Sequence, residues 1–224
     1  MDVLIKSLLE GARQAQGVAV VLDVFRASST LVTLFERGME EVYPVETIEE
    51  ARILKEQNPD LLLMGERGGF PPEGFDLGNS PAEVSNRNFS GRRCVFSTSS
   101  GTKAISVAFE SADEVWVGCF LNAGAVIKKL KQQSPKIVSL VASGMEGMVK
   151  STEDENCALY IKRILKEEKV DFKSKKKEIG ESRFADRLRA RGQQEDLDFS
   201  LQLNKYHLVP KVYSDLKFGK VIKV

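Results

Sequence analysis

Short apolar runs, rich in β-branched residues, alternate along the chain with longer segments whose apolar residues recur at helical spacing. In the first pair, Gly17–Asp23 is an apolar run that ends in an acidic residue, and Ala27–Arg37 has the spacing of a helix that Gly38 closes. The alternation predicts five further strands, with the segments that follow them: Glu41–Val45 with helix Ile48–Gln57, Leu61–Met64 with a loop, Arg93–Ser97 with helix Thr102–Phe109, Val115–Gly118 with helix Asn122–Gln132, and Lys136–Ala142 with a helix over about Glu153–Lys169. Short strands without polar alternation are typical of sheets covered on both faces. We therefore predict an α/β fold, a three-layer α/β/α sandwich with a largely parallel or mixed sheet.

One stretch breaks this alternation. Gly65–Pro81 contains five glycines and three prolines in 17 residues, a composition that excludes a regular helix or a central strand. We expect a structured loop here. Loops of this length inside compact domains usually serve function.

The pattern loosens after Lys169. We interpret the basic run Lys173–Lys177 as a solvated connector, and Arg183–Arg191 predicts a charged helix. We expect one compact unit over residues 1–224, which the pattern allows to divide into a core of about 1–170 and a C-terminal extension of about 171–224. The short apolar tail Val221–Val224, if exposed, favours a homodimer.

Composition and charge narrow the function classes. The 224 residues are 42% hydrophobic and 29% charged, and 33 Lys and Arg against 32 Asp and Glu give a net charge of +1. These values are typical of a soluble globular protein without a one-signed surface, so nucleic acid and polybasic membrane contacts are not expected as partners. The single histidine, His207, excludes His-rich binuclear sites and three-histidine zinc sites within one chain.

Cysteine spacing and apolar run lengths bear on location. The three cysteines are widely spaced and include no C-x-x-C pair, which argues against a disulfide framework or a zinc ribbon. The longest apolar stretch, Val18–Leu22, is far shorter than a membrane span, and no basic segment leads into a long apolar run at the N-terminus. We therefore expect a cytoplasmic protein.

Polar side chains collect where the predicted strands end. In open parallel sheets the carboxyl ends of the strands meet at one edge, where ligands bind. The polar and glycine residues that follow the first, third, fourth, fifth and sixth predicted strands are Asp23, Arg26, Ser28, Ser29 and Thr30; Gly65, Glu66 and Arg67; Thr98, Ser99, Ser100, Gly101 and Thr102; Gly118 and Asn122; and Ser143, Gly144 and Glu146. We expect these residues to share one cleft.

The residue types in this cluster suit phosphate chemistry. Arg26 and Arg67 can each hold an oxyanion through two parallel N–H bonds, and the turn over 98–102 offers hydroxyls and helix-start amides to the same anion. The nearby carboxylates, hard oxygen ligands of the kind that Mg²⁺ accepts, are Asp23, Glu66, Asp76, Glu153 and Asp154. Because phosphoryl transfer requires charge neutralisation at the transferring oxygens, a divalent cation and an arginine clamp together predict that reaction.

Each of these residues also has a purely structural interpretation. Asp23 can cap the helix that begins near Ala27, and Asp76 can stabilise its glycine-rich turn. Arg26 can serve as an ion-pair partner of Asp23. The remaining alternatives are helix-dipole placement for Glu153 and Asp154 and turn formation for Ser99 and Ser100.

Six ordered motifs resemble the 2-phosphosulfolactate phosphatase family. They are Asp-Val-Phe-Arg-Ala-Ser-Ser-Thr (23–30), Gly-Glu-Arg-Gly-Gly (65–69), Gly-Phe-Asp-Leu-Gly-Asn-Ser-Pro (74–81), Ser-Gly-Thr (100–102), Phe-Leu-Asn-Ala (120–123) and Glu-Asp-x-x-Cys-Ala (153–158). The likeness is collinear over about residues 17–160 and continues more weakly through 191–196 to 209–210. The resemblance implies an α/β fold and a Mg²⁺-dependent phosphatase that converts 2-phospho-3-sulfolactate and water to 3-sulfolactate and phosphate, a step in coenzyme M synthesis.

The chain departs from the family pattern at two turns. The family usually has Thr-Thr-Asn-Gly-Thr where this chain has Thr-Ser-Ser-Gly-Thr (98–102), and a Cys-Ala-Gly-like turn where it has Ala-Ser-Gly (142–144). The absence of the Asn and Cys side chains affects the expected identity of the substrate more than the expected class of reaction. A phosphatase for another small acidic phosphomonoester, or a non-catalytic phosphometabolite-binding protein, therefore stands as the alternative.

Together, the strand-end pattern and the resemblance give a full set of expected site residues. We expect catalytic roles for Asp23, Arg26 and Glu66, and Mg²⁺ ligands from Asp23, Asp76 and Asp154. The residues expected to bind the small anionic phosphomonoester are Arg67, Asn79, Ser80, Thr98, Ser99, Ser100, Gly101, Thr102 and Asn122. Water oriented by one carboxylate would attack phosphorus in line, with a covalent Asp23 intermediate as the competing mechanism.

Overall fold

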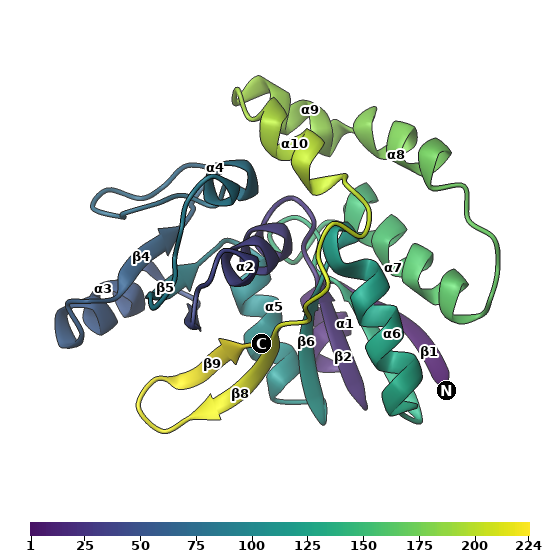
Figure 1. Ribbon diagram of the computed structural model, residues 1–224, viewed down its shortest axis with the longest axis horizontal. Helices are drawn as coiled ribbons and strands as arrows, with labels where there is room; N and C mark the ends of the chain where they lie inside the picture. The colour runs from purple at the N-terminus through teal and green to yellow at the C-terminus, as the bar shows by residue number, and fades with distance from the viewer.

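A computed structural model describes residues 1–224 and contains nine strands in one sheet (Figure 1). The strands are β1 (Asp2–Ser7), β2 (Val18–Leu22), β3 (Glu41–Val45), β4 (Leu62–Gly65), β5 (Arg93–Ser97), β6 (Glu114–Gly118), β7 (Ile137–Ala142), β8 (Lys211–Asp215) and β9 (Gly219–Lys223). The α-helices are α1 (Leu8–Arg13), α2 (Ala27–Glu36), α3 (Ile48–Gln57), α4 (Pro81–Ser85), α5 (Gly101–Phe109), α6 (Ala123–Gln133), α7 (Thr152–Leu165), α8 (Phe172–Gly180), α9 (Arg183–Ala190) and α10 (Gln194–Ser200), with a 3₁₀ turn η1 (Phe120–Asn122) before α6.

The six strands predicted from the sequence form β2 to β7, and the α/β sandwich is confirmed. Every residue of β2 is buried, as expected for a β-branched run covered on both faces. Helix α3 begins where Thr47 and Glu50 form a capping box, which satisfies amides at the helix start. In Figure 1, α6 and α7 lie in front of the strands and α1 and α5 behind them.

The sheet consists of two parallel blocks joined by an antiparallel hairpin. Its strand order is β1-β7-β2-β6-β8-β9-β3-β5-β4. Pairing is parallel within β1-β7-β2-β6 and within β3-β5-β4, whereas β8 and β9 pair antiparallel with each other and with β6 and β3. The sheet is therefore mixed, and the hairpin occupies its middle.

Sheet twist decides where the two blocks point. Three successive antiparallel pairings make β3 run formally opposite to β6. Neighbouring strands are rotated by roughly 20–25°, and by more in two-stranded ribbons, so the rotation accumulates across the hairpin. Figure 1 shows β8 and β9 running across the direction of β6. The carboxyl ends of both blocks can therefore face one region of the molecule.

The C-terminal segment differs from its sequence-based interpretation in two respects. The basic run Lys173–Lys177 is not a connector but part of α8, whose first turn is capped by the Asp171 side chain. The apolar tail is largely buried, since Val221 and Ile222 lie in β9, whereas Val224 is 66% exposed. Burial of two of its three apolar residues within the chain weakens the tail as an argument for a homodimer.

The helices after residue 170 share the main hydrophobic core. Ile179 of α8, Leu188 of α9 and Leu197 of α10 belong to the same buried cluster as the central strands β2 and β6. Figure 1 shows α8, α9 and α10 grouped at one end of the molecule, beyond α2 and α7. This position matters because α9 closes over the strand ends described below.

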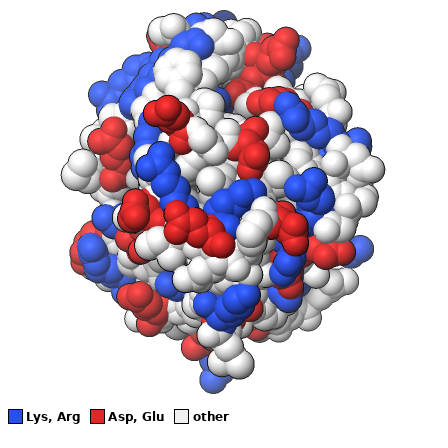
Figure 2. All heavy atoms as spheres, turned by 90° about the vertical axis from the view of Figure 1, so that its left-hand side faces the viewer, with Lys and Arg blue, Asp and Glu red and all other residues white.

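The surface and the helix lengths give two further observations. On the face drawn in Figure 2, Lys and Arg side chains are interspersed with Asp and Glu side chains. None of the helices combines the length and the apolar character needed to cross a bilayer.

Candidate active site

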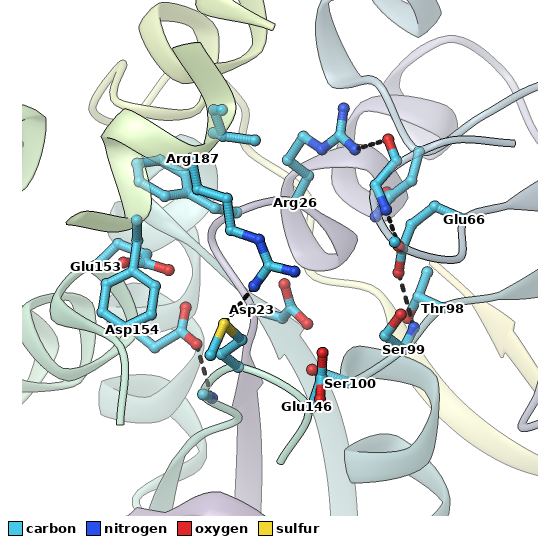
Figure 3. Close-up of a pocket in the computed structure, with 18 of the residues that line it drawn as sticks. Asp23, Arg26, Glu66, Thr98, Ser99, Ser100, Glu146, Glu153, Asp154 and Arg187 are labelled. Atoms are coloured by element: carbon cyan, nitrogen blue, oxygen red, sulfur yellow. Dashed lines mark hydrogen bonds between the residues drawn. The ribbon is translucent and has the colours of Figure 1, made fainter. Parts of the chain in front are cut away.

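A pocket of about 100 Å³ lies where loops from both parallel blocks meet helix α9 (Figure 3). Its size suits a small anion rather than a nucleotide or a polymer. The residues expected from the sequence that line it are Asp23, Arg26, Glu66, Asn79, Thr98, Ser99, Ser100 and Asp154. Residues following β2, β4, β5 and β7 thus converge, as the strand-end pattern predicts.

Asp23 lies at the centre of the pocket, directly after β2. Its Oδ1 accepts a hydrogen bond from the Ala27 amide at 3.1 Å, so the side chain also caps the start of α2. Burial and the neighbouring Asp154 raise the pKa of Asp23 from 3.8 to about 8. The Asp23 carboxyl therefore both caps α2 and lines the pocket.

Two further carboxyls from the start of α7 stand beside Asp23. Asp154 accepts hydrogen bonds from the amides of Val24 at 2.7 Å and Gly144 at 2.9 Å, and burial raises its pKa to about 6. Glu153 is 4% exposed, its Oε2 has no hydrogen-bond partner, and burial with the nearby Asp154 raises its pKa well above the usual value. Three buried acids that line one pocket favour either protonation or a bound cation.

In metal-free protein, the free energy of unfolding is expected to fall by a few kcal/mol as pH rises from about 4 to about 8. Asp23 and Asp154 have folded-state pKa values above the ordinary 3.8, so the folded state holds more protons than the unfolded state in this range. Their contribution to stability is present below about pH 4 and is lost as pH rises through the folded-state pKa values. Urea unfolding in EDTA at pH 4.5, 6 and 8 measures this slope.

Other carboxyls with shifted pKa values do not reverse the expected decrease in stability between pH 4.5 and 8. Glu41, Glu114 and Glu178 have pKa values lowered from 4.5 by Lys223, Lys211 and Lys175, so their contributions to stability change at and below that ordinary value, whereas the raised pKa of Glu153 acts in the same direction as Asp23 and Asp154. An Asp23→Asn variant should show a shallower slope than the wild type. A free energy of unfolding that stays constant or rises between pH 4.5 and 8 would contradict the burial of ionisable carboxyls described here.

Glu66 organises the loop that follows β4. Its Oε2 accepts from the Gly69 amide at 2.8 Å and its Oε1 accepts from the Ser99 amide at 2.8 Å (Figure 3). The carboxylate therefore joins the β4 loop to the β5 loop. Because both oxygens are already engaged by amides, Glu66 holds the wall of the pocket in place while it faces the cavity.

Arg26 belongs to a buried polar network, and its partner is not Asp23. Its Nη1 donates to Asp196 Oδ2 at 2.6 Å, and its Nη2 donates to the Gly69 carbonyl at 2.8 Å. Asp196 Oδ1 in turn accepts from the Ser80 hydroxyl at 2.6 Å and from the Ala82 amide at 3.2 Å. Two of the five guanidinium N–H groups make these bonds, and Arg26 also lines the pocket.

The turn before α5 brings hydroxyls and a helix start to Asp23. Thr98, Ser99 and Ser100 line the pocket, and Ser100 is the N-cap residue of α5. A Cβ at position 101 would lie 2.9 Å from Asp23 Oδ2 and 2.5 Å from Ala27 Cβ, so only glycine allows this approach. The positive end of α5 therefore lies next to the carboxyl cluster, where an anion is stabilised.

Several residues expected to bind metal or substrate lie outside the pocket. The Arg67 guanidinium donates to the carbonyls of Glu46 and Glu66 and to the Ser97 hydroxyl. Asp76 is exposed, and its Oδ2 accepts from the Leu63 amide at 2.8 Å, which is the turn-stabilising role. The expected pairing of Asp76 with Asp23 around a metal is therefore wrong, and Arg67 is not placed to hold an anion in this pocket.

The other residues outside the lining have structural contacts. Thr102 exchanges hydrogen bonds with Thr98, and Asn122 accepts from the Cys119 amide and donates to the Val117 and Leu208 carbonyls. Ser80 caps α4 and bonds Asp196. These residues hold the loops around the pocket.

Two arginines of the C-terminal segment complete the lining. Arg187 of α9 and Arg191 just after it both face the pocket, and Figure 3 shows Arg187 reaching from α9 toward Asp23. Sequence reasoning missed them because their helix follows the strongly patterned part of the chain. The sequence does contain an indication of their position. Phe184 and Leu188 are apolar residues at helical spacing that must face inward, and Arg187 and Arg191 lie on the same face of the helix.

The carboxyl oxygens of the pocket suit an open site for the Mg²⁺ ion that the resemblance implies. No group of three or more His, Cys, Asp or Glu side chains is arranged to enclose a metal. Mg²⁺ does not need one, because it is usually held by one or two carboxylates with water and substrate oxygens. The unpartnered Oε2 of buried Glu153, beside Asp23 and Asp154, fits such an open site.

Comparison with known sequences decides the family. The family model described as 2-phosphosulpholactate phosphatase matches residues 3–215. The chain belongs to this family. The resemblance found in the sequence motifs is thereby confirmed, and with it the class of phosphoric monoester hydrolases.

Individual relatives agree with this placement. The probable 2-phosphosulfolactate phosphatase of Pseudothermotoga lettingae is 36% identical over 213 residues, which cover 89% of this chain and 91% of that protein. That of Thermotoga petrophila is 34% identical over 204 residues, covering 86% and 87%. That of Deinococcus radiodurans is 43% identical over 132 residues, covering 59% and 55%.

The family match also reaches the segment that the motifs identified only weakly. It extends to residue 215 and so includes α9 and α10, which carry Arg187, Arg191 and Asp196. The 2-phosphosulfolactate phosphatase unit therefore comprises these helices together with the strand-end loops.

Proposed function

We propose that the protein hydrolyses 2-phospho-3-sulfolactate to 3-sulfolactate and phosphate. The observation that carries this proposal is one small pocket in which buried carboxyls face arginines and a helix N-terminus, in a chain of the 2-phosphosulfolactate phosphatase family. A phosphoryl group needs neutralising charge on its oxygens and a group that handles a proton. The pocket supplies both within one cavity.

The phosphoryl group is best placed between Asp23 and the start of α5. Thr98 and Ser100 line the pocket together with Asp23, and Arg26 lines it beside the Gly69 loop. Arg26 is held by Asp196 and the Gly69 carbonyl, so its remaining N–H groups are oriented before the substrate arrives. Such preorganised donors stabilise the charge that develops on phosphoryl oxygens.

Asp23 is the residue best placed to act on the reacting atoms. A carboxyl whose pKa lies near neutrality can accept the proton of a water molecule that attacks phosphorus in line. The same carboxyl could instead attack phosphorus itself and form an acyl phosphate that water then hydrolyses. Trapping a phosphorylated protein, or observing a burst of product, would select the second route.

Mg²⁺ is proposed as the cofactor, held by one or two of the carboxyls of Asp23, Glu153 and Asp154 together with water and substrate oxygens. When bound, it would neutralise negative charge on the phosphoryl oxygens. The buried, unpartnered Oε2 of Glu153 supports this assignment.

Asp154→Asn is expected to raise the Mg²⁺ concentration needed for half-maximal activity by about 10–100-fold. The substitution removes one negative charge from the carboxyl cluster while keeping an acceptor for the Val24 amide. Activity titrated with MgCl₂ after EDTA treatment measures the effect. Asp76→Asn is the matched control, because Asp76 lies outside the pocket, and the two variants behaving alike would exclude Asp154 from the metal site.

Turnover of the substrate tests the proposed function directly. Purified protein should release phosphate from 2-phospho-3-sulfolactate in the presence of MgCl₂ and lose this activity in EDTA. No turnover of this ester, of 2-phospholactate or of p-nitrophenyl phosphate, combined with tight binding of the phosphorylated compound, would instead favour a non-catalytic phosphometabolite-binding protein. A role in coenzyme M synthesis and a cytoplasmic location remain predictions.

A further inference from the structure

Two arginines in the pocket have no anionic partner. Arg187 donates only to the Met145 sulfur, and Arg191 makes no side-chain hydrogen bond or ion pair. By contrast, Arg26 is paired with Asp196, and Arg189 of the same helix donates to Asp186. Most of the pocket's positive charge without a counter-ion therefore lies on one helix.

The two guanidinium groups reach opposite walls of the pocket. Arg187 contacts Met145 in the loop after β7, whereas Arg191 lies so close to Gly69, in the loop after β4, that a Cβ there would collide with its Nη1. Arg187 and Arg191 are four residues apart and so share a face of α9. Together they span the cavity between the loop after β7 and the loop after β4, and Figure 3 shows the Arg187 guanidinium near Asp23.

The acidic residues near these arginines do not neutralise them. Glu66 is the acid that raises the pKa of Arg191. Both of its carboxylate oxygens, however, already accept hydrogen bonds from backbone amides. Asp23 and Glu146 line the pocket with Arg187, and neither makes an ion pair with it. Burial and the neighbouring Arg187 and Arg26 lower the pKa of Arg191, which reflects the crowding of three cations.

We propose that Arg187 and Arg191 bind the second anionic group of the substrate, a sulfonate or carboxylate, and so select phosphomonoesters that carry one. This inference rests on the proposed function, which places the phosphoryl group beside Asp23 and the start of α5. Sulfonate and carboxylate oxygens accept the parallel N–H bonds of a guanidinium fork. A neutral ester would leave both cations unpaired and would gain nothing from α9.

The test compares three esters in variants that remove the charge but keep the length of the side chain. Arg187→Met, Arg191→Met and the double variant are assayed with 2-phospho-3-sulfolactate, 2-phospholactate and p-nitrophenyl phosphate. We expect kcat/KM for 2-phospho-3-sulfolactate to fall by about 10-fold in each single variant and about 10²-fold in the double variant, the size of one charged hydrogen bond each. The decrease in kcat/KM for 2-phospholactate measures the contribution of a carboxylate alone. For p-nitrophenyl phosphate, kcat/KM should change by less than about 2-fold.

Arg189→Met is the matched control on the same helix. Arg189 faces away from the pocket and pairs with Asp186 and Gln194, so its replacement should leave kcat/KM for all three esters within about 2-fold. An equal loss for p-nitrophenyl phosphate and 2-phospho-3-sulfolactate in the Arg187 and Arg191 variants would overturn the proposal. So would the absence of a loss for 2-phospho-3-sulfolactate.

Binding separates this inference from the proposed function. If the wild type hydrolyses none of the esters, the proposed function fails, and calorimetry with 3-sulfolactate still tests the arginines. We expect the double variant to bind 3-sulfolactate at least about 10-fold more weakly than the wild type and inorganic phosphate equally well. Unchanged 3-sulfolactate affinity would reject the role of α9.

Discussion

Replacing Asp23 by asparagine is expected to lower kcat by about 10³-fold while the protein stays folded. Asparagine has nearly the same shape and can still accept the Ala27 hydrogen bond that caps α2. It cannot accept a proton from water, attack phosphorus or carry the negative charge that a cation requires. Steady-state kinetics with 2-phospho-3-sulfolactate and saturating MgCl₂ measure the loss.

The same substitution should make the metal-free protein more stable at pH 8. The wild-type carboxyl is buried beside Asp154 and resists ionisation, and asparagine removes that cost. Asp76→Asn serves as the control, because that side chain is exposed and should change neither property. An Asp23→Asn variant that keeps wild-type kcat would exclude Asp23 from the chemistry under either mechanism.

Replacing Asp196 by alanine is expected to lower the free energy of unfolding by about 3–5 kcal/mol. The change leaves the Arg26 guanidinium, 5% exposed, without its carboxylate, and removes the acceptor of the Ser80 hydroxyl and the Ala82 amide. Because Arg26 loses the contact that orients it, KM should rise as well. Urea unfolding and steady-state kinetics on the same preparation measure both effects.

Two further variants separate the loss of this pair from general damage to α10. Asp198→Ala removes an exposed carboxyl from the same helix and should cost less than about 0.5 kcal/mol. The double variant Arg26→Met/Asp196→Leu removes both charges and should recover part of the stability without recovering activity. The proposed orientation of Arg26 fails if Asp196→Ala unfolds at the same urea concentration as Asp198→Ala.

Local sequence patterns predicted the parts of the fold that depend on local burial. Strands β2 to β7 are continuous apolar runs, so their identity does not depend on knowing their neighbours. The hairpin β8–β9 is different, because only Val212, Val221 and Ile222 of it are buried and it becomes a sheet element only by pairing with β6 and β3. Edge strand β1, which pairs only with β7, was missed for the same reason.

Strand-end reasoning located the site but could not decide which of two neighbouring side chains faces it. Glu66 and Arg67 are adjacent in an extended segment, so they point to opposite sides, and only Glu66 faces the cavity. Local pattern could show that Arg191 shares a helix face with Phe184 and Leu188, but it could not place Asp196 or Arg191 beside the pocket. Their proximity to Arg26 and Gly69 depends on how α9 and α10 pack over loops more than 100 residues earlier in the sequence.

The central position of the hairpin has a kinetic consequence. Val42 of β3 pairs with Ile222 of β9, so the two parallel blocks are joined by a contact between residues 180 positions apart. Closing so long a loop is entropically costly and slow compared with pairing inside β3-β5-β4, where Glu41 pairs with Arg93 and Leu62 with Cys94. The β3-β5-β4 block is therefore expected to form early, as an intermediate with an unpaired edge at β3, and insertion of residues 211–223 is expected to be the late step that brings the two halves of the pocket together.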